Sequence, residues 1–115
     1  MIKGIHHVAI VVSSQESVGF YERLGFDVTL RIDRGYDKVV LLSGYGINIE
    51  MFIDSKYKEL NAQDKGYGVR HLALKVENVE DMANEFECGQ IMTDWVGKKY
   101  CYTTDPDGLQ IEFHE

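Results

Sequence analysis

The sequence predicts an α+β fold of two tandem βαβββ modules whose strands form a curved, cup-shaped mixed sheet. The first observation behind this prediction is an internal repeat, because residues 5–53 can be laid over residues 69–114 with their patterns in the same order. The second is that each copy opens with an alternating apolar segment followed by a helix start pattern. The length of 115 residues is about that of one domain, so we expect a single domain spanning residues 1–115.

Each module is expected to begin with a half-buried strand that carries a histidine in an equivalent place. Residues 5–12 (IHHVAIVV) align with residues 69–76 (VRHLALKV), which puts His7 and His71 64 residues apart. Both segments alternate in the manner of a strand with one buried face. We therefore expect both histidines on the face that points away from the helix, whereas His6 falls on the opposite face and is interpreted as structural.

A helix is expected after each of these strands. Ser13 and Glu16 match a capping box at the start of the first helix, and Asn78 is expected to cap the second. Gly25 and Gly89, again 64 residues apart, are expected to end the two helices. The second helix has an apolar stripe at the i, i+3, i+4, i+7 spacing, made of Val79, Met82, Ala83 and Phe86.

Three short strands are expected after each helix. They cover about residues 26–33, 36–43 and 47–53 in the first module, and about residues 90–94, 99–104 and 109–114 in the second. The turn sequence of residues 105–108 (DPDG) joins the last two strands. We expect module 1 at about residues 4–54, a polar linker at about 55–68, and module 2 at about 69–115.

The charge balance excludes some classes of partner. Twelve Lys and Arg against nineteen Asp and Glu give a net charge of −7, and no basic run is longer than Lys98-Lys99, so we expect no nucleic acid partner. The apolar residues 1–12 are too short to span a bilayer and lack a cleavage site, which predicts a cytoplasmic protein without a membrane partner. Cys88 and Cys101 have no metal-ligand spacing and are expected to be buried thiols of a reducing compartment.

Two histidines and two glutamates form the candidate site. Glu50 and Glu112 lie in the last expected strand of their modules, among alternating apolar residues that face the helix. The glutamates, like His7 and His71, are therefore expected on the open face, where a cup would bring all four together. Burial of four ionisable groups costs free energy that a divalent cation would offset, so the pattern predicts a metal site. His114, at an expected frayed C-terminus, is interpreted as structural.

Four segments carry a resemblance to a known family: residues 5–10 (IHHVAI), 69–74 (VRHLAL), 20–26 (FYERLGF) and 105–112 (DPDGLQIE). Over nearly its whole length the chain resembles the vicinal oxygen chelate superfamily, which includes glyoxalase I, methylmalonyl-CoA epimerase, fosfomycin-resistance enzymes, extradiol dioxygenases and bleomycin-binding proteins. The resemblance implies the glyoxalase/bleomycin resistance fold and one divalent metal ion, Ni, Co, Mn, Fe or Zn. Carried over position by position, the metal ligands are His7, Glu50, His71 and Glu112.

A set of four ligands resembles the glyoxalase I branch rather than the extradiol dioxygenases, whose site has two histidines and one carboxylate. The resemblance then implies a metal-dependent lyase or isomerase, similar to lactoylglutathione lyase, that abstracts a proton α to a carbonyl. Glu112 is the first choice for the base and Glu50 the second. The expected substrate is a small molecule such as a thiol adduct of an aldehyde. Val11 and Asp54 stand where bacterial glyoxalase I has an Arg and an Asn that hold glutathione, which argues against glutathione as cosubstrate.

Alternatives from other classes stay open. A non-catalytic small-molecule-binding or resistance protein of the same fold would lack the metal ligands. A thiol transferase that opens an epoxide would need a basic pocket for a phosphonate, for which this acidic chain offers few cations. An epimerase or a dioxygenase of the superfamily is a further alternative. We also expect a homodimer, because a linker of about fifteen residues lets the cup close within one chain or by exchange of modules with a partner.

Overall fold

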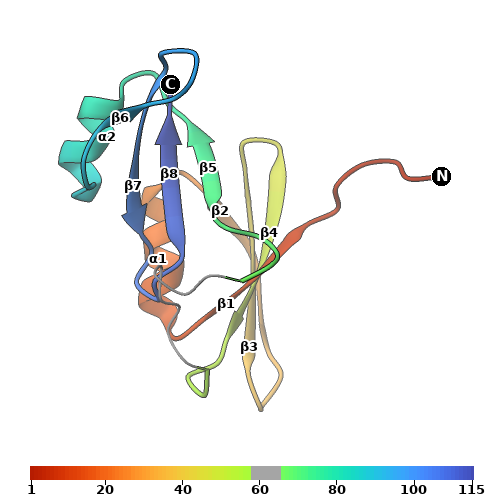
Figure 1. Ribbon diagram of the computed structural model, residues 1–115. Coiled ribbons are helices and arrows are strands. Elements are labelled where there is room, and N and C mark those ends of the chain that lie inside the picture. Colours follow the sequence, from red (N-terminus) through yellow and green to blue (C-terminus); the bar gives the residue numbers. More distant parts are fainter. Residues whose placement is uncertain (58–65) are drawn as a thin grey trace. The chain divides into compact units, whose positions relative to one another are not determined.

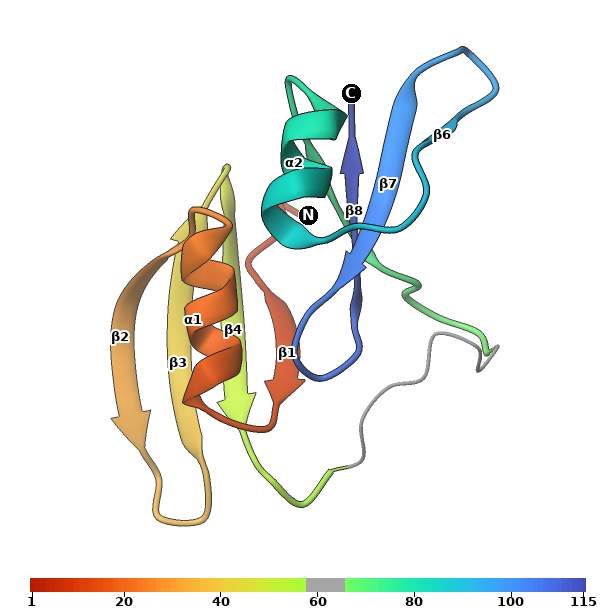
Figure 2. The ribbon, with the colours of Figure 1, turned by 90° about the vertical axis from the view of Figure 1, so that its left-hand side faces the viewer.

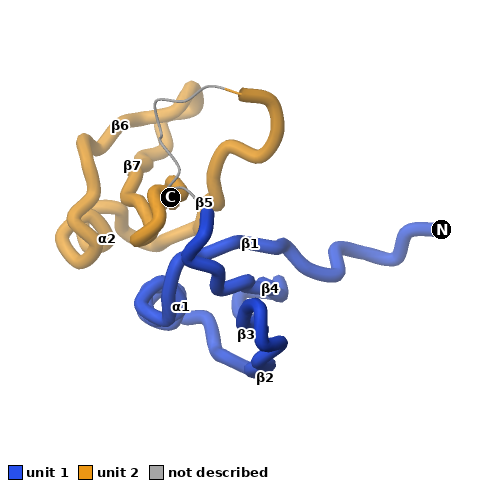
Figure 3. Tube along the Cα trace, turned by 90° about the horizontal axis from the view of Figure 1, so that it is seen from below, with its two compact units in different colours: residues 1–58 blue, residues 59–115 orange. Residues whose placement is uncertain are grey.

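The computed structural model describes residues 1–57 and 66–115, and the chain forms two compact units, Met1–Lys58 and Glu59–Glu115 (Figure 3). Within the described residues, each unit contains one helix and one four-stranded sheet. Most of the linker expected at residues 55–68 lies outside the described residues. Each unit has its own sheet and its own buried core, so each positions its own side chains.

Unit 1 follows the expected order of strand, helix and three strands (Figure 1). Its elements are β1 (Val8–Val12), α1 (Gln15–Arg23), β2 (Asp27–Asp33), β3 (Lys38–Gly44) and β4 (Ile47–Ile53). The sheet order is β1-β4-β3-β2, in which β1 runs parallel to β4 and the other neighbours are antiparallel. The first and last strands of the unit are therefore adjacent.

Unit 2 repeats the same plan, which confirms the predicted α+β fold. Its elements are β5 (Leu72–Lys75), α2 (Val79–Phe86), β6 (Met92–Thr93), β7 (Lys99–Thr104) and β8 (Gln110–His114). The sheet order is β5-β8-β7-β6, with β5 parallel to β8. Within the described parts of the chain, no helix is long and apolar enough to cross a bilayer.

In each unit the helix covers one face of the sheet (Figure 2). Apolar side chains of the helix and the sheet are buried in each unit. In unit 1, Tyr21 of α1 and the alternate residues Ile49 and Met51 of β4 are 1% exposed or less. In unit 2, the rings of Phe86 in α2 and Phe113 in β8 lie 5.4 Å apart. Burial of each such side chain contributes roughly 1.5–3 kcal/mol. The alternation that buries these residues leaves their neighbours in β4 and β8 on the open face.

The start of α2 confirms its predicted cap, whereas the N-cap of α1 lies one residue after the predicted one. Asn78 is the N-cap of α2, and its side chain accepts a hydrogen bond of 2.9 Å from the backbone N–H of Asp81. In α1 the N-cap is Ser14 rather than Ser13, and the Ser14 side chain makes no capping hydrogen bond. The N-cap therefore differs from the prediction by one residue, and Glu16 stands at the second helical position rather than the third.

The two helices also end differently. Gly25 follows the C-cap Leu24 of α1 with φ of 109°, as expected for a glycine that ends a helix. A Cβ at Gly25 would collide with the hydroxyl of Tyr45, which donates a hydrogen bond to the Leu24 carbonyl. The prediction for Gly89 is wrong, because α2 ends earlier and Glu87 adopts the left-handed conformation with φ of 53°. Its backbone N–H bonds to a carbonyl of the last turn, which closes the helix without a glycine.

Both first strands begin later than predicted, and this places the two histidines. β1 and β5 each start three residues after the predicted first residue, so His7 and His71 come directly before their strands. In unit 1 the side-chain amide of Asn48 donates to the backbone carbonyl of His6 at 3.4 Å. This hydrogen bond from a side chain therefore stands in the place of the backbone hydrogen bonds that a longer β1 would have made with β4.

Candidate functional site

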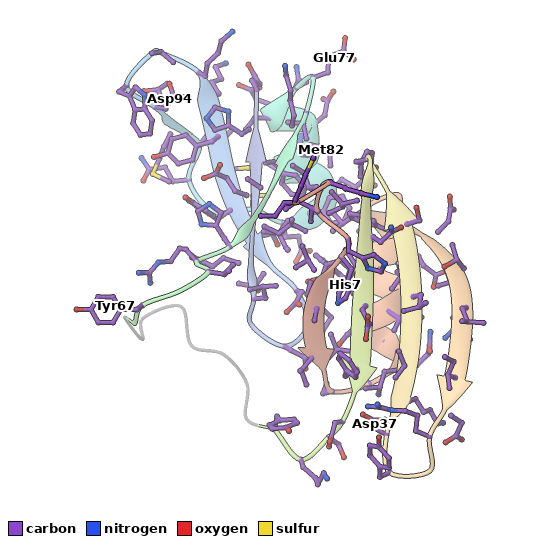
Figure 4. All side chains as sticks on the ribbon, turned by 90° about the vertical axis from the view of Figure 1, so that its right-hand side faces the viewer. His7, Asp37, Tyr67, Glu77, Met82 and Asp94 are labelled. Atoms are coloured by element: carbon purple, nitrogen blue, oxygen red, sulfur yellow. The ribbon has the colours of Figure 1, made fainter. Side chains whose placement is uncertain are left out.

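Unit 1 brings His7 and Glu50 together on the open face of its sheet. Glu50 lies in β4 and pairs in register with Ala9 of β1, two residues after His7. His7 Nε2 is 3.2 Å from Glu50 Oε2, and the two side chains are 37% and 30% exposed. The Nδ1 atoms of His7 and His6 are 2.9 Å apart, so His6 contacts the first pair from outside. Figure 4 shows the His7 side chain beside β1 and β4.

Unit 2 holds an equivalent pair that is more deeply placed. Glu112 lies in β8 and pairs in register with Ala73 of β5, two residues after His71. His71 Nε2 is 3.6 Å from Glu112 Oε1, and the two side chains are 26% and 14% exposed. The repeat seen in the sequence is therefore also a repeat of backbone register. Each histidine meets the glutamate of its own unit.

The chemistry and spacing of each pair fit a divalent metal ion. Imidazole nitrogen and carboxylate oxygen are ligands that several divalent metals accept. Two ligand atoms that are each about 2.1 Å from a metal and adjacent around it are roughly 3.0 to 3.4 Å apart. The distances of 3.2 and 3.6 Å lie in or near this range. Within residues 1–57 and 66–115 no three His, Cys, Asp or Glu side chains gather closely enough to hold a metal, so each unit contributes a pair of candidate ligands.

His71 contains a buried nitrogen that lacks a hydrogen-bond partner among the described residues. This atom is Nδ1, while Nε2 faces Glu112. A buried polar atom without a partner costs about 1–3 kcal/mol, and such atoms in native proteins call for an explanation such as a functional role or a bound ion. The His71 imidazole therefore has one nitrogen whose hydrogen-bonding capacity is unused among the described residues. Nδ1 lies across the ring from Nε2, so its lack of a partner is separate from the contact with Glu112.

Tyr102 belongs to this site and was missed by the sequence reasoning. It lies in β7 directly opposite Glu112 in the register of β7 and β8, so the two side chains share one face of the sheet. Its ring meets the His71 ring edge to face at 5.4 Å. Burial, and then the interaction with Glu112, raise the pKa of Tyr102 to about 12, so the phenol is protonated and a donor at neutral pH. The backbone N–H of Asp105 donates to the carbonyl of Leu109, which sets this register. Counting symmetrically from the predicted turn at residues 105–108 would instead put Ile111 opposite Tyr102, so the sequence pattern did not reveal this neighbour.

His114 is firmly held, which corrects the expectation of a frayed C-terminus. Its Nε2 is 3.0 Å from Asp94 Oδ2, its Nδ1 is 2.7 Å from the backbone carbonyl oxygen of Glu115, and its ring stacks on Tyr100. Burial acts to raise the pKa of Asp94, but hydrogen bonds from backbone N–H groups of the turn after it, and from His114, lower the pKa below its ordinary value. Asp94, labelled in Figure 4, thus fixes the turn between β6 and β7. The structural interpretation of His114 is consistent with these contacts.

Similarity to known proteins extends over almost the whole chain. The model of the Glyoxalase/Bleomycin resistance protein/Dioxygenase superfamily matches residues 4–113. The chain is 35% identical over 126 residues to the uncharacterized protein YwkD of Bacillus subtilis (strain 168), with 100% of this chain and 98% of YwkD covered. It is similar in structure to a glyoxalase family protein from Enterococcus faecalis, with a TM-score of 0.86, 36% identity and 98% of each chain covered.

A more distant structure shares the fold alone. It is a mutant of the fosfomycin resistance protein FosX from Listeria monocytogenes, complexed with Mn(II) and 1S,2S-dihydroxypropylphosphonic acid. The TM-score is 0.77 at 18% identity, with 99% of this chain and 90% of FosX covered. The same arrangement of strands and helices thus occurs in proteins whose sequences have diverged widely.

Proposed function

The chain belongs to the Glyoxalase/Bleomycin resistance protein/Dioxygenase superfamily, and from this premise we propose that it is a metal-dependent lyase or isomerase of the glyoxalase I type. The observation that carries the proposal is the recurrence of a histidine–glutamate pair at the same register in both units. A histidine and a carboxylate that meet once on a sheet face are usually structural. The repetition of this pair on the face opposite the helix favours a common functional role, which is the binding of a metal ion.

The proposed ligands of one divalent metal ion are His7, Glu50, His71 and Glu112. When bound, the metal ion supplies a Lewis acid that stabilises negative charge on the carbonyl oxygen of the substrate. The spacing of each pair supports this ligand set. The Mn(II) in the FosX complex gives a precedent for a divalent metal in this fold.

The protein's own contribution to the proposed reaction is the transfer of a proton. Glu112 takes a proton from the carbon next to a carbonyl and returns it to the neighbouring carbon, so the product is an isomer of the substrate. Glu50, the second candidate for this role, is the more exposed carboxylate and faces His7. A well-placed general base contributes typically 10² to 10⁴ in rate. The substrate we propose is a small α-oxygenated carbonyl compound or a thiol adduct of an aldehyde.

Metal analysis tests the ligand set. We expect the purified protein to contain close to one divalent transition metal ion per four-residue set, measured by elemental analysis. The variant His71→Ala should lose the metal, whereas the control His6→Ala should keep it with at most a weakened affinity, because His6 contacts His7 but is outside the proposed set. Metal retention in both variants would contradict the proposal.

Turnover of a substrate panel tests the reaction. The panel contains hemithioacetals of methylglyoxal with different thiols, free α-hydroxy carbonyl compounds and an epoxide offered with a thiol. The variant Glu112→Gln should lower kcat by 10² or more, since an amide ligates weakly and cannot accept the proton. Turnover of the epoxide alone would favour a thiol transferase. Metal-dependent binding without turnover of any member would favour a binding protein.

A further inference from the structure

The two histidine–glutamate pairs differ in what lies across the strand from each glutamate. In unit 2 the residue opposite Glu112 is Tyr102 of β7, whose side chain lies on the same face of the sheet and ends in a hydroxyl that can donate a hydrogen bond to the carboxylate. In unit 1 the residue opposite Glu50 at the equivalent register is Leu41 of β3, whose side chain has no polar atom to offer. Opposed residues of an antiparallel pair share one face of the sheet. The two glutamates therefore occupy equivalent backbone positions, and the side chains opposite them can be compared directly. One of these side chains is a tyrosine and the other is a leucine.

Tyr102 constrains Glu112 from two directions. Its side chain stands directly across the strand pair from the carboxylate, on the same face, and its ring contacts the ring of His71 at 5.4 Å. The Glu112 side chain is 14% exposed, against 30% for Glu50. A glutamate has three side-chain torsions to fix, so an added donor and lower exposure both reduce the number of positions its oxygens can take. Glu112 is the more restrained of the two carboxylates.

We propose that Tyr102 is a positioning residue, whose hydroxyl holds Glu112 in the orientation needed to bind the metal and so makes unit 2 the tighter half of the site. This inference rests on the proposed function, because it assumes that Glu112 is a ligand. Hydrogen-bond partners of metal ligands orient them, and loss of such a partner typically weakens metal binding 10- to 100-fold. Unit 1 lacks this partner at the equivalent register, since Leu41 stands there.

The alternative use of the hydroxyl is a direct contact with substrate. A phenol carries a single proton to donate, so a hydroxyl that donates to Glu112 has no second proton for the substrate. Positioning and substrate contact predict different measurements. Positioning changes the metal affinity in the absence of substrate, whereas substrate contact changes KM and leaves the metal affinity as it is.

The test is a metal titration of the full chain after chelation and dialysis, by calorimetry with Co²⁺, Mn²⁺ and Zn²⁺. Tyr102→Phe keeps the ring against His71 and removes the hydroxyl alone. Tyr100→Phe is the matched control, because Tyr100 lies two residues away in β7 and its ring stacks on His114. We expect the metal dissociation constant to rise at least tenfold in Tyr102→Phe and to change less than twofold in Tyr100→Phe. Thermal unfolding of the metal-free proteins should be similar in both variants.

Two results would overturn the inference. An unchanged dissociation constant in Tyr102→Phe with a raised KM would assign the hydroxyl to substrate, and an unchanged constant with an unchanged KM would leave it no role in the site. If Tyr102→Phe lowers the stability of the metal-free protein, a second pair of variants is compared. Tyr102→Leu copies Leu41 of unit 1, and Tyr100→Leu is its control. The inference then requires that Tyr102→Leu lose at least tenfold in metal affinity relative to Tyr100→Leu. A wild-type protein that binds none of the three metals would instead refute the proposed function, and this inference with it.

Discussion

The thiol of Cys88 should react with alkylating reagents about fiftyfold more slowly in the folded protein than in the unfolded chain. Cys88 lies just beyond α2, partly buried, with Sγ 3.9 Å from the backbone carbonyl oxygen of Met82. Burial is the main cause that raises its pKa from 9.0 to about 12, and contact with Cys101 adds to the rise. The expectation of two buried thiols is thus met by Cys101, whereas Cys88 remains half-buried.

The rate follows from the fraction of thiolate, because the thiolate is the nucleophile. At pH 8 a thiol with a pKa of 9.0 is about one tenth ionised, and one with a pKa of about 12 is about one ten-thousandth ionised. This thousandfold loss is offset roughly twentyfold by the higher intrinsic reactivity of a more basic thiolate, which leaves about fiftyfold. The unfolded chain also loses this proton at lower pH than the folded one. The free energy of unfolding should therefore fall as the pH rises above about 9.

The assay is pulsed alkylation with iodoacetamide at pH 8, read by mass spectrometry of the Cys88 peptide. The reference is the same chain in guanidinium chloride. In Cys101→Ala the burial of Cys88 persists, so Cys88 should still react more slowly than the reference, although faster than in the wild type. A folded-state rate for Cys88 within threefold of the unfolded rate would show that neither burial nor Cys101 protects this thiol.

Three further predictions concern stability, substrate and assembly. Asn78→Ala should lower the free energy of unfolding by about 1 kcal/mol because it removes the cap of α2, whereas Ser14→Ala should cost less than ~0.5 kcal/mol; equal effects in urea denaturation would contradict this. Because Val11 and Asp54 replace the Arg and Asn of bacterial glyoxalase I, the hemithioacetal of methylglyoxal with glutathione should be a poor substrate. A kcat/KM above ~10⁵ M⁻¹s⁻¹ with any restored metal would show that these replacements do not matter. Light scattering at micromolar concentration should give a dimer, and a mass of only 13.2 kDa would refute it.

Local patterns in the sequence predicted the strands best where a strand ends at a turn residue. The strands at residues 47–53 and 99–104 have the predicted bounds, since turn-forming residues border them. The strand predicted at residues 90–94 shrinks to Met92–Thr93, because only these two residues pair with β7. The length of an edge strand depends on its neighbour, which a local pattern does not contain.

In the candidate site, too, features set by local sequence were predicted, and features that depend on distant residues were missed. The histidine–glutamate pairs were visible because they recur in order along the chain. Tyr102 was missed because its role depends on a partner across the hairpin, ten residues away. The anchoring of His114 depends on Asp94, twenty residues earlier, in a turn whose shape the sequence pattern did not predict. Side chains that act through a neighbouring strand become visible only when the register is known.

Tyr45 ties the end of α1 to the turn between β3 and β4. Its backbone has a φ of 53°, which glycine or asparagine would adopt at lower cost, yet its hydroxyl occupies the space beside Gly25 and bonds to the Leu24 carbonyl. Positions 25 and 45 therefore cannot change independently during evolution. A side chain at 25 would displace the ring, and a small residue at 45 would leave the carbonyl without its donor. Among relatives we expect glycine at 25 to covary with tyrosine at 45, so that the pair marks this module even in lineages that have lost the histidine and the glutamate.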